Sequence, residues 1–122
     1  MSITIAIAGK GGTGKTTIAS LLAKLLTEKG TVLAIDADPS VNLHLALGLH
    51  LEDTIGEIRE ELLEAAHSGK MPPGMSRHEY VDLNVRQSVV ESRGLDLMAM
   101  GRPEGPGCYC AANHMVARFM DV

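Results

Sequence analysis

Three groups of residues in this chain have types and spacings that suit chemistry: a glycine-rich loop, a pair of aspartates and a pair of cysteines. The loop reads GKGGTGKTT over residues 9–17, the aspartates are Asp36 and Asp38, and the only cysteines are Cys108 and Cys110. Such a loop suits phosphate binding, the carboxylates suit coordination of water or a metal ion, and the thiols suit metal or redox chemistry. Each group needs strands and helices to position it.

The loop satisfies the G-x-x-x-x-G-K-[ST] pattern, which cradles nucleotide phosphates when it joins a strand to a helix. Its glycines let successive backbone N–H groups point inward, and the following helix adds the positive end of its dipole. Lys15 is predicted to neutralise the outer phosphates, Thr16 to coordinate a bridging Mg²⁺, and Thr17 to support the α-phosphate. The predicted ATP-binding residues are Gly9, Lys10, Gly11, Gly12, Thr13, Gly14, Lys15, Thr16 and Thr17.

The same glycines also spell the G-x-G-x-x-G pattern of a dinucleotide site, and Asp36 follows at about the spacing of that site's acidic residue. Lys15 and Thr16 favour the phosphate-cradling loop, because a dinucleotide site requires close helix-to-sheet packing where an ammonium and a hydroxyl add nothing. A plain turn is a poorer explanation, since four glycines cost backbone entropy that a simple connection does not require.

Hydrophobic patterning predicts the elements around the loop. Alternating isoleucines and small residues predict a buried strand over residues 3–8, and apolar residues at helical spacing predict a helix over 15–29. Further strands are expected at 31–38 and 95–100. This order predicts an α/β fold, a three-layer P-loop NTPase with a mostly parallel sheet flanked by helices.

Helix signals mark the rest of the chain. Thr54 and Glu57 form a capping box that opens a helix ending at Gly69. Residues 78–92 are expected to be an amphipathic or partly irregular element, and residues 111–122 a helix. Residues 40–49 are expected to form a short loop or helix.

Composition excludes several classes of function. The formal charge of −4 has no basic stripe, and one Phe, two Tyr and no Trp leave little to stack nucleobases on, so no nucleic-acid partner is predicted. Neither a signal peptide nor a membrane-spanning run is recognisable, which predicts a cytoplasmic protein with no membrane partner. In that compartment two cysteines are expected to be reduced thiols, metal ligands or redox groups rather than a structural disulfide.

Lys10 is a second lysine that the general phosphate-loop pattern does not require. With KGGTGKT complete, the loop resembles the deviant Walker A of the ATPase family that includes MinD, ParA, the nitrogenase iron protein and arsenical pumps. The resemblance implies that Lys10 reaches across an ATP-dependent homodimer to the partner's phosphates. IDADPSVN resembles the family's switch region, which implies that Asp38 activates the attacking water and that Asp36 lies near Mg²⁺. Lys10, Lys15 and Asp38 are therefore the predicted catalytic residues, although Asp38-Pro39 alone fits a plain turn equally well.

Cys108 and Cys110 are one residue apart, so their thiolates can converge on one ion, whereas a disulfide between them would be strained. Two sulfurs are half of what tetrahedral zinc or square-planar nickel(II) requires, and a two-fold dimer would supply the other half. Residue types alone leave inert buried thiols as an equal alternative. His114 could add a donor but is better explained as an ordinary helix residue.

The stretch MGRPEGPGCYCAANH, together with the loop and DADPSVNL, resembles the CooC-type ATPases that insert nickel into carbon monoxide dehydrogenase. The resemblance implies that Cys108 and Cys110 of two subunits bind Ni²⁺ or Zn²⁺ and that ATP drives delivery to the dehydrogenase. A ParA/MinD-type positioning ATPase and an iron-protein-like electron-transfer ATPase are the alternatives. A second aspartate-bearing switch and adenine-binding residues are missing from the sequence. Residues 1–122 are therefore expected to be the N-terminal part of a single, apparently truncated ATPase domain, and hydrolysis is expected of the full-length protein.

Overall fold

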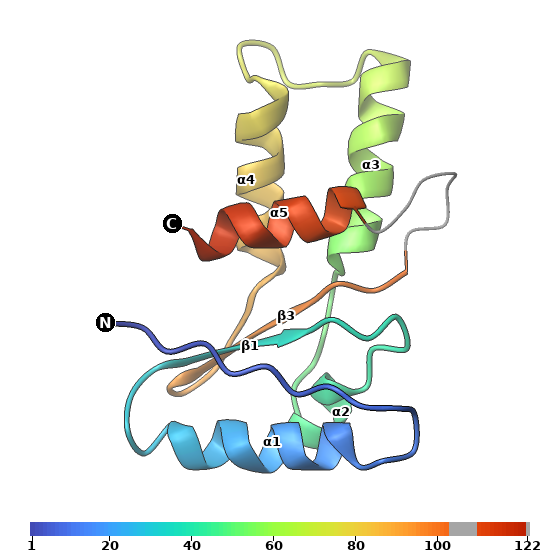
Figure 1. Cartoon of the computed structure of the whole chain (residues 1–122). Helices are drawn as coiled ribbons and strands as arrows, with labels where there is room; N and C mark the ends of the chain where they lie inside the picture. The colour runs from blue at the N-terminus through green and yellow to red at the C-terminus, as the bar shows by residue number, and fades with distance from the viewer. Residues whose placement is uncertain (103–109, 122) are drawn as a thin grey trace.

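The computed structural model describes residues 1–102 and 110–121, in which helices cover both faces of a small sheet (Figure 1). Three strands form the sheet in the order β1-β3-β2. The elements in chain order are α1 (Lys15–Leu26), β1 (Val32–Asp36), α2 (Leu43–Leu47), α3 (Ile55–Ser68), α4 (Arg77–Ser88), β2 (Val90–Glu91), β3 (Leu95–Ala99) and α5 (Cys110–Met120). The predicted α/β class is confirmed.

The central pairing is parallel, between β1 and β3. Its register runs from Val32 opposite Leu95 to Asp36 opposite Ala99, so both strands end at the same edge of the sheet. β2 is antiparallel to β3, which makes the sheet mixed. The sequence did not predict β2, a strand of two residues that a tight turn through Gly94 folds back onto β3.

Each face of the sheet has its own hydrophobic core, because side chains alternate along β3. Leu95 and Leu97 pack with α1 and α2 on one face, while Met98 contacts α3, α4 and α5 on the other. Figure 1 shows α1 and α2 on one side of the sheet and the upright pair α3 and α4, crossed by α5, on the other. The side chain of Met98 is fully buried and belongs to this second core.

The prediction of a strand over residues 3–8 was wrong, because residues 1–10 form no regular element. Ile3 and Ile5 are 83% and 53% exposed. Small residues alternate with these isoleucines and bury little surface by themselves, so such a segment becomes a strand only between partner strands and under cover on both faces. Leu21 and Leu25 of α1 are also exposed, so this side of the described structure has too little apolar cover to bury the segment.

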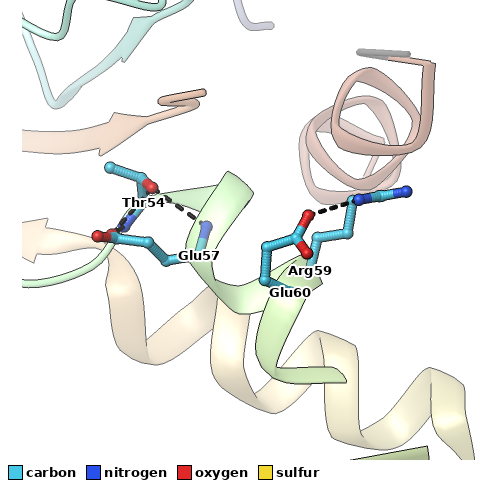
Figure 2. Close-up of polar contacts among 4 residues, drawn as sticks. All are labelled: Thr54, Glu57, Arg59 and Glu60. Atoms are coloured by element: carbon cyan, nitrogen blue, oxygen red, sulfur yellow. Dashed lines mark hydrogen bonds and ion pairs between the residues drawn. The ribbon is translucent and has the colours of Figure 1, made fainter. Parts of the chain in front are cut away.

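Capping boxes fix the starts of the two long helices. The Thr54 side chain accepts from the Glu57 N–H, and the Glu57 carboxylate accepts from the Thr54 N–H at 2.7 Å, as Figure 2 shows. The predicted box at α3 is therefore confirmed. Ser76 and Glu79 form the same reciprocal pair at α4. The sequence SRHE carries that signal, and it shows why residues 77–88 are a regular helix rather than a partly irregular element.

Gly101 begins the segment that leads from β3 toward the cysteines, and its backbone has φ +64°. A Cβ atom at this position would lie 2.6 Å from Thr54 Oγ1 and 2.7 Å from Thr54 Cβ. Only glycine combines that backbone conformation with so close an approach to the start of α3.

We therefore expect Gly101→Ala to lower the free energy of unfolding by about 2–4 kcal/mol, from the left-handed backbone and the clash together. Gly74→Ala is the matched control, because Gly74 also has a positive φ but has no atom within 4 Å of an added Cβ. Its cost should be about 1 kcal/mol. Urea denaturation measures both, and equal losses would contradict the role assigned to Thr54.

Candidate functional site

The glycine-rich loop leads directly into the first turn of α1. Gly12 and Gly14 have φ of +78° and +89°, the left-handed conformations that curl the loop. Gly14 is the N-cap residue, no side chain caps the helix, and no acidic residue lies in its first turn. The backbone N–H groups and the positive end of the helix dipole therefore lack a local anion. This arrangement fits a bound phosphate, and the Thr16 hydroxyl in the same turn is an oxygen ligand of the kind that Mg²⁺ accepts.

The loop is closed on itself by two side-chain hydrogen bonds. Lys15 Nζ donates to the Gly9 carbonyl oxygen, and Thr13 Oγ1 donates to the Lys10 carbonyl oxygen at 2.6 Å. A Cβ added to Gly9 would lie 3.1 Å from Thr13 Oγ1, so the turn leaves little space at that position. A phosphate in the loop would take the place of the Gly9 carbonyl as the partner of the Lys15 ammonium.

Asp36 ends β1 and organises the loop that follows. Its Oδ1 accepts from the Asp38 N–H at 3.1 Å, and its Oδ2 accepts from the N–H groups of Asn42 and Leu43 at 3.1 and 3.0 Å. The residue is 8% exposed. Sequence reasoning placed Asp36 near Mg²⁺ and missed this structural role, for which a carboxylate a few residues before a short helix is the only sequence signal.

Asp38 is fully exposed in the same loop. Its Oδ1 accepts from the Ser40 N–H at 2.9 Å. That bond and a second one with the Ser40 side chain hold the pKa of the Asp38 carboxyl below its usual value. Partial desolvation acts in the opposite direction, and the Lys15 ammonium, which is the smallest of these causes, lowers the pKa. Asp38 is therefore an ionised carboxylate that is held mainly by Ser40 and feels only a weak attraction to the lysine of the phosphate loop.

Val41 adds strain to this loop. Its φ is +46°, and it is the one non-glycine residue with positive φ in the described part of the chain. A β-branched residue rarely occupies this region, and such strain persists only where surrounding bonds impose it. Asp36 provides those bonds through Asn42 and Leu43, which directly follow Val41.

The chain leaves β3 toward the cysteines at the same edge of the sheet as this loop, because Asp36 pairs in register with Ala99 at the end of β3. Residues 100–110 are called the cysteine segment. Cys110 begins α5 and is exposed, whereas Cys108 lies outside the described residues. Cys110 is disulfide-bonded in the structure, which differs from the expected reduced thiol. Metal binding therefore requires the reduced form, since only a thiolate is a ligand.

His114 is exposed on α5, one helical turn after Cys110. No group of three or more His, Cys, Asp or Glu residues that could hold a metal occurs within residues 1–102 and 110–121. The same residues include no helix with the length and apolar character needed to cross a membrane.

Loop, helix N-terminus and carboxylates at the carboxyl edge of a parallel strand pair define a P-loop nucleotide-binding protein of the α/β class. The model of the CobQ/CobB/MinD/ParA nucleotide-binding domain matches residues 4–103, and the chain belongs to that family. This placement confirms the predicted family of P-loop ATPases.

Three similar proteins illustrate the range of the family. The chain is 43% identical over 118 residues to an uncharacterized ATP-binding protein of Methanocaldococcus jannaschii, covering 96% of this chain and 47% of that protein. It is 33% identical over 125 residues to the carbon monoxide dehydrogenase accessory protein CooC of Rhodospirillum rubrum, covering 95% and 48%. It is 36% identical over 112 residues to a light-independent protochlorophyllide reductase iron-sulfur ATP-binding protein of Roseiflexus sp., covering 88% and 36%. The chain thus spans about half the length or less of these relatives.

The bonds to Asp36 lead to a prediction about stability. Asp36→Asn replaces one acceptor oxygen with an amide donor and removes the charge, so at least one backbone N–H loses its partner in a nearly buried position. We expect the free energy of unfolding to fall by about 1–3 kcal/mol. Asp53→Asn, on an exposed loop residue, should change it by less than about 0.5 kcal/mol. Thermal denaturation of the two variants compares them, and equal stability would contradict the role of Asp36.

Proposed function

We propose that the whole protein is an ATP-hydrolysing accessory protein that dimerises on ATP and delivers nickel to the nickel-iron-sulfur cluster of carbon monoxide dehydrogenase. The observation that carries the proposal is the common edge of β1 and β3, from which both the Asp36–Asp38 loop and the cysteine segment depart. A change of nucleotide state that moved the Asp36–Asp38 loop would therefore act close to the point where the chain leaves β3 toward the cysteines. Similarity to CooC over 95% of the chain supports the choice of client.

In this proposal the phosphate loop binds ATP through its backbone N–H groups and Lys15, and the Thr16 hydroxyl holds Mg²⁺ with Asp36 near it. A Mg²⁺ ion held by these residues would supply positive charge against the outer phosphates. Asp38, ionised at neutral pH, orients the attacking water and accepts its proton. The chain covers about half of its relatives or less, which supports the proposal that residues 1–122 are the N-terminal part of a single larger domain. The proposal places the whole protein in the cytoplasm.

Dimerisation depends on Lys10, whose exposed side chain lies on the loop itself. The Lys10 carbonyl is held by Thr13 Oγ1. That bond fixes the backbone at Lys10, while the ammonium remains available for the phosphates of a second subunit. Two facing copies would also place four cysteines at one interface, as a shared metal ion requires.

Substitutions of Lys10 and Lys15 should have different effects on ATP binding and on dimerisation. Lys10→Ala should retain ATP binding within about threefold and lose ATP-dependent dimerisation, because its contact is made only across the dimer. Lys15→Ala should weaken ATP binding by about 100-fold or more, because the charge-assisted pairing of the ammonium with the outer phosphates is lost. Lys24→Ala, on the last turn of α1, is the control for both effects.

Nucleotide titration and sedimentation velocity of the whole protein, with Mg²⁺ and a non-hydrolysable ATP analogue, measure these properties. A Lys10→Ala protein that dimerised like the parent would refute the contact across the interface.

The metal site makes a separate prediction. Under anaerobic, reducing conditions the dimer should bind one Ni²⁺ or Zn²⁺ per two subunits, because four thiolates complete a coordination sphere. Replacing Cys108 and Cys110 with Ala should abolish that binding, and His114→Ala should preserve it. Elemental analysis and metal titration check the ratio. Equal affinity in the double cysteine variant would show that the ligands are misassigned.

An electron-transfer ATPase is the second candidate, because one relative is an iron-sulfur ATP-binding protein. Four cysteines at a dimer interface would also hold an iron-sulfur cluster. A brown colour and visible absorbance after anaerobic purification would favour that function over nickel delivery. A positioning ATPase is supported by a shorter match, to a carboxysome distribution protein over 46% of this chain.

A further inference from the structure

Residues of α3, α4 and α5 line a hollow of about 390 Å³. These three helices lie on the face of the sheet opposite α1 (Figure 1). We call it the basic hollow. Its apolar lining comes from all three helices: Leu62, Leu63, Val81, Val85, Met115 and Phe119. Phe119 is the only phenylalanine in the sequence. Leu63 is 37% exposed and Phe119 is partly exposed, so water reaches this lining although three helices converge on it.

Arginines surround the apolar lining. Arg59, Arg77, Arg86 and Arg118 border the hollow, which is four of the six arginines in a chain of net charge −4. Asp82 is the one carboxylate among the described residues that line it. Positive charge is therefore concentrated here against the overall charge of the protein, which is the pattern expected of a surface that attracts an acidic ligand.

Only part of this positive charge is neutralised locally. Arg118 lies 3.2 Å from Asp82, and Arg59 lies 2.7 Å from Glu60, a pair that Figure 2 shows on α3. Arg77 and Arg86 are exposed and form no ion pair within the described part of the chain. The guanidinium group of Arg77, at the start of α4, and that of Arg86, near its end, are thus available to carboxylates of a ligand.

We propose that the basic hollow docks an acidic amphipathic helix of a partner protein. Apolar side chains spaced one turn apart on that helix would enter between α3, α4 and α5, and flanking carboxylates would pair with Arg77 and Arg86. A concave surface formed by crossed helices favours a helix over a membrane, because a flat bilayer does not fill a hollow. The charge pattern likewise disfavours a second copy of this surface, whose arginines would repel.

α5 links the basic hollow to Cys110. α5 begins at Cys110, and His114, one turn later, lines the hollow. A helix seated there would contact the element that starts at the cysteine segment. The proposal itself requires neither metal nor nucleotide, so docking can be tested separately from metal delivery.

The test uses the whole protein and a fluorescent, designed helical peptide with leucines one turn apart, flanked by glutamates. Anisotropy should show saturable binding that falls about tenfold when salt is raised to about 0.5 M. Arg77→Ala with Arg86→Ala should weaken binding by about tenfold, since two charge pairs are lost. Leu63→Ser should also weaken it about tenfold, because the substitution removes exposed apolar lining.

Matched controls separate specific docking from general attraction. Arg93→Ala, on an exposed arginine that does not line the hollow, should leave binding unchanged. A peptide with lysines in place of glutamates should not bind. Amide shifts in a nuclear magnetic resonance spectrum should be confined to α3, α4 and α5.

Several results would overturn the proposal. The first is an absence of peptide binding at about 1 mM peptide. The second is a loss of affinity in Arg93→Ala as large as that in the Arg77→Ala, Arg86→Ala double variant. The third is an affinity for the lysine peptide equal to that for the glutamate peptide. Arginine-dependent sedimentation with phosphatidylglycerol vesicles, without peptide binding, would identify a membrane surface instead. Conversion of a nucleotide-free dimer into a monomer by Leu63→Ser would identify a second copy as the occupant.

Discussion

The parallel pairing of β1 with β3 is the constraint on which the rest of the structure depends. Because Asp36 lies opposite Ala99, both strands release the chain at one edge of the sheet. The Met100 N–H then donates to the Asp36 carbonyl at 2.9 Å, which continues the alignment beyond the last paired residues. A shift of this register by one residue would reverse which β3 side chains face each core and would separate the two loops.

Local signals predicted well wherever the cause of structure is also local. The glycine loop, the start of the helix after it and the Thr54 capping box depend on residues a few positions apart, and all three occur where the sequence places them. The end of that helix does not, since α1 ends at Leu26 rather than at residue 29. Ser76 and Glu79 carry an equally local signal at the start of α4. Such features are readable because the side chain and the backbone group that it satisfies are neighbours in the chain.

Features that depend on distant partners could not be predicted in this way. Ile3 and Ile5 have the alternation of a buried strand, yet a strand requires neighbours that no local pattern supplies. The hydrogen bond from the Asn42 N–H to the Asp36 carboxylate depends on how β1 ends and α2 begins, and a local pattern indicates only that a carboxylate is present. The basic hollow combines residues of three helices, and no local pattern in the sequence indicates that these helices pack together.

β3 lies between the two faces of the sheet and contributes side chains to the core on each face. Leu97 packs against the α1 and α2 side, where the phosphate loop begins α1, while Met98 packs beneath the helices that form the basic hollow. Neighbouring residues of one strand therefore contact both cores. β3 is therefore the strand that contacts both cores, and the pairing that aligns the two loops also fixes the packing beneath the helices on each face.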